Sequence, residues 1–556
     1  MRIRPGLQLS ALLIVFGAGC SAQPHGAARR ELLAPRAAIV LPPLSGESER
    51  DRARHALDRL AFGPRPRDVE TVAKEGVARW ITRQLDPRSI ADDTAEKGLS
   101  LLPTLSLPTS ALYERYPDPR AVAAKAGLAK AGLTLKDPDG KEQVRSPERA
   151  EPQPQVRALV NPGELPRQIL KELVAQKVYR AVVSERQLEE VLVDFWFNHF
   201  NVFAGKGDVR WLLTSYERDA IRPHVLGKFR DLLEATAAHP AMLFYLDNWT
   251  STKDGLRRGG RTLGPNENYA RELLELHTMG VDGGYTQNDV REVARCFTGW
   301  SFVRERRGRG PRGGEIGTFV FREAAHDRGE KTVLGTVIPA GGGIEDARRV
   351  LDLLAARPET ARFLATKLCR RFLADDPPGA AVARVAEAFR RSGGDLSVTL
   401  RALVTSPEMW SDAARGAKTK TPFELAISAT RALGASVSPY NAIPSWIEKM
   451  GAPLYGCQPP TGFADTASAW VNAGGLLARL NFGLALAGGR IAGVKADPGA
   501  LAGTNGDALE RLSRALLATP PSQATRDALA GSGEAREPDA VLIAGLLLGS
   551  PEFQRR

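Results

Sequence analysis

Two carboxylates, Glu272 and Glu275, lie three positions apart in a stretch that is dense in charged and amide side chains. The stretch covers residues 266 to 300 and reads NENYARELLELHTMGVDGGYTQNDVREVARCFTGW. Residues three apart on a helix share a face, so the two side chains can act together. A carboxylate whose pKa is shifted by its surroundings can serve as a general base or a general acid. Glu272 and Glu275 are therefore candidate catalytic residues.

The same stretch also has a structural interpretation, as two amphipathic helices that are joined by a glycine turn. Asn266 is a residue type that caps helices, and Thr286 with Asp289 is typical of a capping box. The spacing of the apolar residues predicts helices over residues 267 to 279 and 287 to 298. We expect the two helices to pack through Leu273, Leu274, His277, Val290, Val293 and Phe297.

The polar face of these helices needs partners if it points into the protein. We favour a buried ionic lattice in which Glu272 is largely buried and paired with an arginine, since a buried carboxylate must be partnered. A catalytic or ligand pocket is the first alternative, and a metal site is the second. Glu272 and His277 stand five residues apart, about 140° around a helix, so one metal ion cannot bind both. The candidate binding residues of this stretch and of two other segments are Asn198, Asn268, Arg271, Tyr285, Gln287, Asp289, Arg295 and Asp327.

Two histidines in other segments are also candidate catalytic residues. His199 lies in the aromatic segment WFNHF, where a histidine is more often a hydrogen-bonded core residue than a catalyst. Burial would nevertheless shift its pKa and allow acid–base chemistry. His326 adjoins Asp327 in a segment that we expect to be a loop. No cofactor can be named, because the GGG at 341 to 343 is not followed by the Lys-Ser/Thr of a phosphate-binding loop, and the sequence has no CxxC, HExxH or GxSxG motif.

The first twenty residues, MRIRPGLQLSALLIVFGAGC, predict where the protein is located. Arg2 and Arg4 precede an apolar stretch from Leu7 to Phe16, which is too short to span a bilayer and is typical of a secretory signal. The closing GAGC resembles a bacterial lipoprotein signal, in which Cys20 becomes the lipidated first residue. Gly17 stands where that pattern usually has Leu, Val or Ile, so plain secretion is the alternative. We expect an exported envelope protein that is anchored to a membrane through Cys20.

The composition of the chain indicates which partners are favoured. The 556 residues carry a formal charge of +12, which favours anionic envelope components. This charge is spread over the whole chain without a run of five consecutive Lys or Arg residues, so a nucleic-acid groove is disfavoured. Beyond Cys20 the three cysteines, Cys296, Cys369 and Cys457, allow one disulfide at most. The fold therefore does not depend on disulfides.

Hydrophobic spacing predicts a mainly α fold, a large multi-helix globular protein with at most one or two small β-hairpins. GTFVF, residues 317 to 321, and KTVLGTVI, residues 331 to 338, are expected to pair as one hairpin. The predicted divisions of the chain are a lipoprotein-type signal peptide (1–20), a flexible tether (21–48), N-terminal helices (49–96), a polar insertion (97–160), a main helical domain (161–439) and a C-terminal helical portion (440–556).

Several long blocks of the chain, in order, resemble the bacterial family called domain of unknown function 1800. These blocks are HALDRLAFGP, DFWFNHFNVF, ERDAIRPHVLGKFRDLLEATAAHPAMLFYLDN, the stretch from 266 to 300, KTPFELAISATRALGA and SPEFQ. The resemblance covers roughly residues 50 to 555. It implies a large, mainly helical and usually exported protein, and it implies no activity. The segment APLYGCQPPTGFADTASAW, residues 452 to 470, is called the proline-rich loop. Phe463 of this loop stands where the family commonly has a tryptophan.

Overall fold

The structure is a computed structural model of the chain. It describes residues 38–43, 48–119, 122, 135–136, 142–143, 165–258, 260–304, 314–503, 507–531 and 539–556. The described residues from Ile39 to Arg556 belong to one compact unit. The predicted signal peptide, its lipidation residue Cys20 and much of the predicted polar insertion lie outside the described residues.

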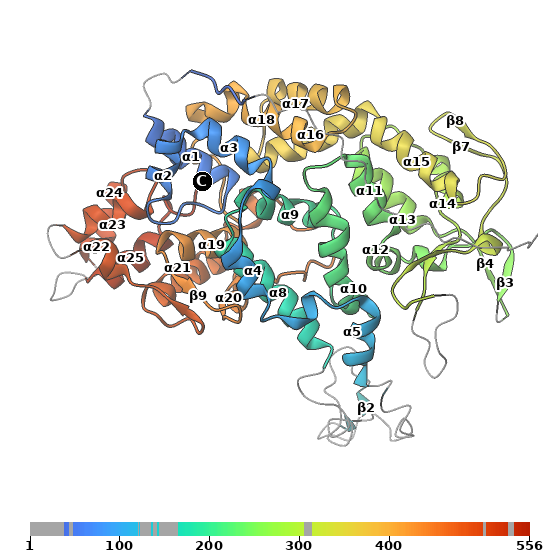
Figure 1. Ribbon diagram of the computed structural model, residues 1–556, viewed down its shortest axis with the longest axis horizontal. Coiled ribbons are helices and arrows are strands. Elements are labelled where there is room, and N and C mark those ends of the chain that lie inside the picture. Colours follow the sequence, from blue (N-terminus) through green and yellow to red (C-terminus); the bar gives the residue numbers. More distant parts are fainter. Residues whose placement is uncertain are drawn as a thin grey trace, which may run out of the picture. The chain divides into compact units, whose positions relative to one another are not determined.

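The unit from Ile39 to Arg556 is mainly α-helical, which confirms the predicted fold class; its described residues include 23 α-helices (Figure 1). The N-terminal helices are α1 (Glu49–Leu60), α2 (Asp68–Glu75), α3 (Val77–Gln84), α4 (Asp93–Leu99) and α5 (Thr109–Arg115). The central helices are α8 (Arg167–Val183), α9 (Gln187–His199), α10 (Val209–Ser215), α11 (Phe229–Ala238), α12 (Pro240–Tyr245), α13 (Glu267–Glu272), α14 (Gln287–Cys296), α15 (Ile344–Ala356), α16 (Pro358–Phe372), α17 (Gly379–Arg391), α18 (Leu396–Val404) and α19 (Pro422–Ala432). The C-terminal helices are α20 (Ile443–Lys449), α21 (Ala473–Ala487), α22 (Pro498–Ala502), α23 (Ala508–Leu516), α24 (Gln523–Gly531) and α25 (Ala540–Gly549).

Local sequence signals begin several of these helices. Ser48 caps α1 in a capping box with Asp51, so two orphan backbone N–H groups are satisfied within one turn. Thr421 does the same for α19, where Pro422 is the first helical residue and needs no backbone donor. Two segments are π-helices rather than α-helices. They are η5 (Tyr216–Ile221) and η8 (Leu273–Thr278).

The described strands form five two-stranded antiparallel sheets, more than the one or two hairpins that were expected. The paired strands are β1 (Leu135–Lys136) with β2 (Glu142–Gln143), β3 (Leu256–Arg258) with β4 (Arg261–Leu263), β5 (Trp300–Phe302) with β6 (Phe319–Phe321), β7 (Lys331–Val333) with β8 (Thr336–Ile338), and β9 (Ser436–Val437) with β10 (Val494–Lys495).

The predicted pairing of residues 317–321 with residues 331–338 is wrong. Segment 331–338 closes on itself as β7 and β8, and β6 pairs with β5 instead. The two residues between β7 and β8, Leu334 and Gly335, have φ of 50° and 78°. Positive φ at both central residues is the geometry of a two-residue type I′ turn. A leucine in this conformation is uncommon, which is why the sequence did not signal the turn.

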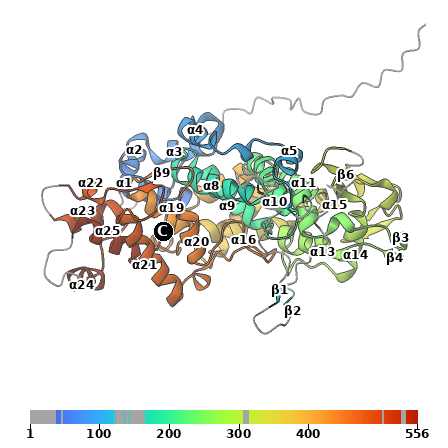
Figure 2. The same ribbon diagram turned by 90° about the horizontal axis from the view of Figure 1, so that it is seen from below.

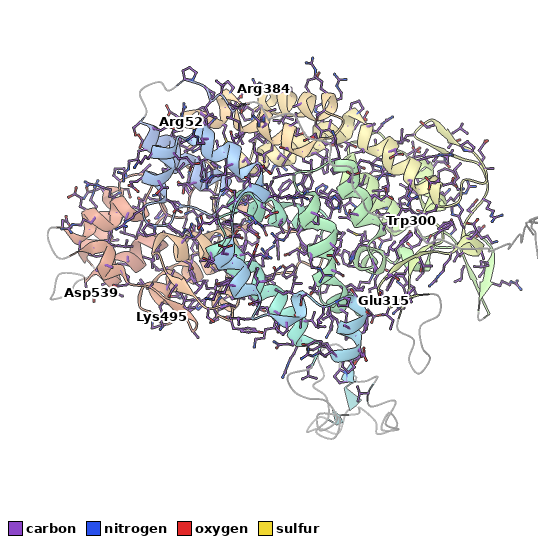
Figure 3. All side chains as sticks on the ribbon, viewed as in Figure 1. Arg52, Trp300, Glu315, Arg384, Lys495 and Asp539 are labelled. Atoms are coloured by element: carbon purple, nitrogen blue, oxygen red, sulfur yellow. The ribbon has the colours of Figure 1, made fainter. Side chains whose placement is uncertain are left out.

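The hydrophobic core runs through the whole unit and joins elements that are distant in the sequence. Figure 3 shows the side chains of the unit on its ribbon. Helices α21 and α25 pack closely because a glycine stands at their contact. A Cβ on Gly483 would lie 2.7 Å from the backbone oxygen of Gly545. The C-terminal segment also joins the core, since Arg555 forms a β-bridge with Thr419. The last residues of the chain are therefore packed with the segment that leads into α19.

Candidate functional site

The stretch from 266 to 300 forms the two predicted helices, with a local change in winding. Asn266 caps α13, accepting a hydrogen bond from the backbone N–H of Asn268. The helix then continues as the π-helix η8 directly after Glu272. Thr286 and Asp289 form the predicted capping box of α14. The six residues that were predicted to pack the helices together are all buried; they are Leu273, Leu274, His277, Val290, Val293 and Phe297.

The prediction that Glu272 is largely buried and paired with an arginine is wrong. Glu272 is half-buried, and it forms no hydrogen bond or ion pair with any described residue. The arginines nearby have other partners. Arg271 donates to Glu267 at 3.3 Å and to Gln287 at 3.0 Å, and Arg291 also pairs with Glu267, at 3.5 Å. Glu267 therefore faces α14, which contributes Gln287 and Arg291 as its partners.

The unpaired, half-buried carboxylate of Glu272 has a raised pKa. Burial raises the pKa of Glu272, and the neighbouring charge of Glu275 raises it further, against a smaller opposing effect of Arg271. A carboxylate with a raised pKa holds a proton more readily near neutral pH and can return it to a substrate. Glu272 also lies immediately before a π-helix, a winding that is frequent at functional sites.

Two tyrosines complete the surroundings of the carboxylate pair. Tyr285 donates a hydrogen bond to Glu275 at 3.4 Å, and burial together with that carboxylate raises the pKa of Tyr285 to about 12. Tyr245 of α12 donates to the backbone oxygen of Gln458 at 2.6 Å. Burial raises the pKa of Tyr245, and the charge of Glu272 contributes. Tyr245 is distant from Glu272 along the chain, so no local pattern in the sequence predicted their proximity.

Asn198 is a clamp for the proline-rich loop rather than a free ligand-binding group. Its side-chain amide donates to the backbone oxygen of Phe463 at 2.8 Å, and its side-chain oxygen accepts from the backbone N–H of the same residue at 2.8 Å. Asn201 donates to the backbone oxygens of Cys457 and Pro459, at 3.0 and 2.8 Å. Asn201 was not among the candidate binding residues. It lies three residues after Asn198, and this spacing could have indicated that both side chains bind the same loop.

His199 and His277 are buried together among aromatic rings. Nε2 of His199 lies 3.1 Å from the backbone oxygen of His277, and Nδ1 has no partner among the described residues. Burial holds the pKa of His199 well below its usual range and lowers that of His277 to about 3. Both rings are therefore neutral at physiological pH. His199 is 1% exposed, which removes it from contact with a substrate in solution.

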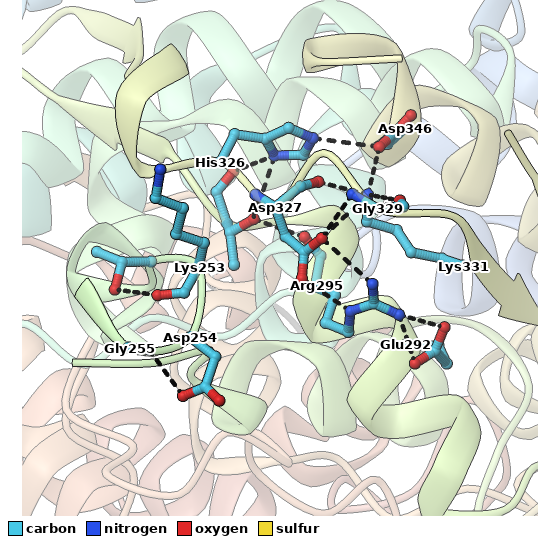
Figure 4. A network of polar contacts seen from close by, with 12 residues as sticks. Lys253, Asp254, Gly255, Glu292, Arg295, His326, Asp327, Gly329, Lys331 and Asp346 are labelled. Carbon is cyan, nitrogen blue, oxygen red and sulfur yellow. Dashed lines mark hydrogen bonds and ion pairs between the residues drawn. The ribbon is translucent and has the colours of Figure 1, made fainter. Parts of the chain in front are cut away.

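His326 belongs to a buried ionic network (Figure 4). A buried ionic lattice was predicted around Glu272, but the network lies around Asp346 instead. Its Nε2 lies 3.1 Å from Asp346 Oδ2, and the ammonium of Lys331 donates to the same oxygen at 2.7 Å. At the edge of the network, Arg295 donates to Asp327 at 2.8 Å and to Glu292 at 2.8 Å. The lattice thus joins α14, α15 and β7.

The remaining predicted binding residues stabilise local structure. Gln287 donates to Glu267 at 2.7 Å, and Asn268 donates to the backbone oxygen of Leu246 at 3.2 Å. Asp289, besides capping α14, accepts from the backbone N–H of Leu334 at 2.7 Å. The structure therefore brings Glu272, Glu275 and Tyr285 together. His199 and His326 lie in separate buried environments, so the predicted candidates do not form one site.

Neither a metal site nor a membrane span is found in the described part of the chain. It holds no group of three or more His, Cys, Asp or Glu side chains placed to bind a metal ion. No helix within these residues has the length and apolar character needed to cross a bilayer. The cysteines Cys296, Cys369 and Cys457 are free and buried.

Comparison with known proteins identifies a family. The family model described as "Protein of unknown function (DUF1800)" matches residues 55–555, nearly the whole chain. No curated protein and no solved structure matches the chain.

Proposed function

The chain belongs to the DUF1800 family, and we propose that this member is an exported, lipid-anchored protein that acts as a helical scaffold or binding protein of the bacterial cell envelope. One observation carries the choice of a scaffold or binding protein over an enzyme. The four candidate catalytic side chains do not converge on one accessible cleft, because His199 and His326 are each 1% exposed and have separate partners.

The anchoring part of the proposal is supported by the N-terminal sequence. Arg2 and Arg4, the short apolar stretch after them and the small residues before Cys20 make up a lipoprotein-type signal. A single lipid chain gives only marginal membrane binding, so stable anchoring through Cys20 requires a second lipid chain or a basic patch. Replacing Cys20 by Ala should move the protein from the membrane fraction to the soluble fraction. Unchanged fractionation of that variant would contradict the anchor.

The binding part of the proposal is tested with the purified chain from Ser21, which contains the whole compact unit from Ile39 to Arg556. A panel of envelope polysaccharides and small anions is screened by calorimetry, and metal content is measured in the same preparation. Saturable binding without turnover supports the proposal. Turnover of a ligand by the wild-type protein would replace the binding function with a catalytic one.

A second candidate function is a hydrolase-type enzyme that uses Glu272 and Glu275. The observation in its favour is that Glu272 is unpaired and half-buried, with a raised pKa, beside another carboxylate. A panel of ester and glycoside substrates would test it. Glu272→Gln should then abolish turnover while leaving the fold intact, and Glu267→Gln is the matched control, because Glu267 is bound to Arg271 and Gln287.

A further inference from the structure

A large cleft lies apart from the carboxylate pair, where the N-terminal helices meet the C-terminal helices. In both views α1 and α2 lie beside α22 and α23 (Figures 1 and 2). The cleft has a volume of about 980 Å³, at the upper end of the range for small-molecule sites. It is named the arginine cleft here, after the seven arginines that line it: Arg50, Arg54, Arg65, Arg67, Arg511, Arg514 and Arg526.

The carboxylates that line the arginine cleft are all engaged. Asp51 caps α1 together with Ser48, and Asp507 caps α23. Glu70 pairs with Arg50 at 2.8 Å, and Glu510 pairs with Arg514 at 2.6 Å. With seven arginines against these four carboxylates, three positive charges of the lining are not balanced by acidic residues of the lining.

Two further arginines of the cleft have partners outside its lining. Arg54 donates to Asp58 at 3.0 Å and to the backbone oxygen of Leu516 at 2.8 Å, and so joins α1 to α23. Arg65 donates to Glu185 at 2.7 Å. The contact of Arg54 with Leu516 ties the two walls of the cleft together.

The other three arginines of the cleft form no side-chain hydrogen bond or ion pair with a described residue. They are Arg67, Arg511 and Arg526. Arg67 has φ of 71° at the residue before α2. Glycine or asparagine would adopt that conformation with less strain. The guanidinium of Arg511 lies against Gly503, where any side chain would collide with it. A free guanidinium offers several donors in the fixed geometry that suits phosphate and carboxylate groups.

The rest of the lining indicates what kind of anion fits. None of the described lining residues is aromatic, so the cleft has no platform on which nucleobases would stack. None of the exposed large hydrophobic side chains in the described part of the chain lines it. A membrane-binding surface would present such side chains to the bilayer. The concave shape and the arginines of the lining favour a soluble anionic ligand.

We propose that the arginine cleft binds a small organic polyanion, a soluble molecule with two or more phosphate or carboxylate groups, which Arg67, Arg511 and Arg526 recognise. This inference rests on the proposed binding function and names the class of ligand. The anionic groups of the ligand supply the partners that these three guanidinium groups do not find among the described residues. The ligand binds without chemical change, so no second reactant is needed.

The test is calorimetric titration of the chain from Ser21 with pyrophosphate and with citrate, at low and at moderate salt. We expect saturable binding at one site that weakens as salt increases. Arg67→Gln and Arg511→Gln should each weaken binding about tenfold, the effect of losing one charge-assisted hydrogen bond. The matched control is Arg391→Gln on α17, which removes the same charge from an exposed side chain that pairs with Glu387.

Three outcomes would overturn the proposal. They are the absence of saturable binding of either probe, an equal loss of affinity in Arg391→Gln, and binding only to phosphatidylcholine vesicles that contain phosphatidylglycerol. The last outcome would assign the cleft to a membrane surface. Failure here is distinguishable from failure of the proposed function, because Cys20→Ala still reports on anchoring and the wider ligand panel still reports on binding at other surfaces.

Discussion

Lys331 and His326 share one oxygen of Asp346, at 2.7 and 3.1 Å, and all three side chains are fully buried. Asp346→Asn would leave the Lys331 ammonium in the interior without its carboxylate. We expect a loss of about 3–5 kcal/mol in the free energy of unfolding, the usual cost of breaking a buried ion pair. Thermal and urea unfolding measure it.

The matched control for that variant is Asp412→Asn. Asp412 is fully exposed, and its nearest ion-pair atom on Arg415 is 3.8 Å away, so the change should stay within about 0.5 kcal/mol. If Asp346→Asn unfolds with the wild-type midpoint, the network does not stabilise the fold.

Glu424→Gln should destabilise the protein much more than Glu272→Gln does. Glu424 is buried and accepts from Arg371 and from Arg556, the latter at 2.8 Å. Burial alone would raise its pKa, but the two arginines outweigh burial and hold the pKa far below the usual range. Its replacement should cost about 3–5 kcal/mol. Glu272 has no such partner, so its replacement should change the midpoint of a thermal melt little. A large loss of stability in Glu272→Gln would show that this carboxylate has a structural partner after all.

Histidines that stay neutral in the folded protein should make it sensitive to mild acid. Burial lowers the pKa of His239 and His277 to about 3 and that of His55 to about 4. In the unfolded chain each binds a proton below about pH 6.5, whereas the folded protein does not. The free energy of unfolding should therefore fall as pH decreases from 6.5 to 4, by about 1.4 kcal/mol per pH unit for each histidine.

Urea unfolding at a series of pH values between 7 and 4.5 measures this slope. His239→Asn keeps a side chain that can cap α12, because asparagine accepts a backbone N–H as His239 does. It cannot take up the proton, so the slope should decrease by about one proton. A stability that is constant over this range would contradict the neutral state of these histidines.

Asn198→Ala should loosen the proline-rich loop. The variant loses both hydrogen bonds to Phe463, which together contribute about 1–3 kcal/mol. Limited proteolysis should then cut residues 453–470 faster than in the wild-type protein. Asn268→Ala is the control, since its side chain donates to Leu246 and does not touch the loop. Equal cleavage in the wild type and in Asn198→Ala would mean that other contacts hold the loop.

The local structure of the chain could be predicted because its causes lie within a few residues. Thr286 and Asp289 cap α14 through contacts three positions apart, and the apolar residues of α13 and α14 repeat at helical spacing. The mainly α fold class follows from many such local patterns. The hairpin prediction failed because the turn at Leu334 and Gly335 depends on two backbone conformations that a leucine seldom adopts.

The candidate site was predicted only in part. Glu275 and Tyr285 are ten residues apart and meet across the glycine turn, so their proximity follows from the local sequence. Tyr245 and the proline-rich loop join them only in the folded chain. Asn198 holds Phe463 across 265 positions, and no local pattern specifies a contact of that separation.

The sequence by itself determined the helices, their caps and the set of charged residues that had to find partners. The tertiary structure alone decided which partners they found. Arg271, Arg291 and Arg295 were all within reach of Glu272 along the chain, yet they pair with Glu267, Glu292 and Asp327. Ion pairs form between whichever opposite charges packing brings within a few ångströms, because the interaction weakens with distance and with exposure to water. Packing left Glu272 unpaired and placed His326 and Lys331 on Asp346.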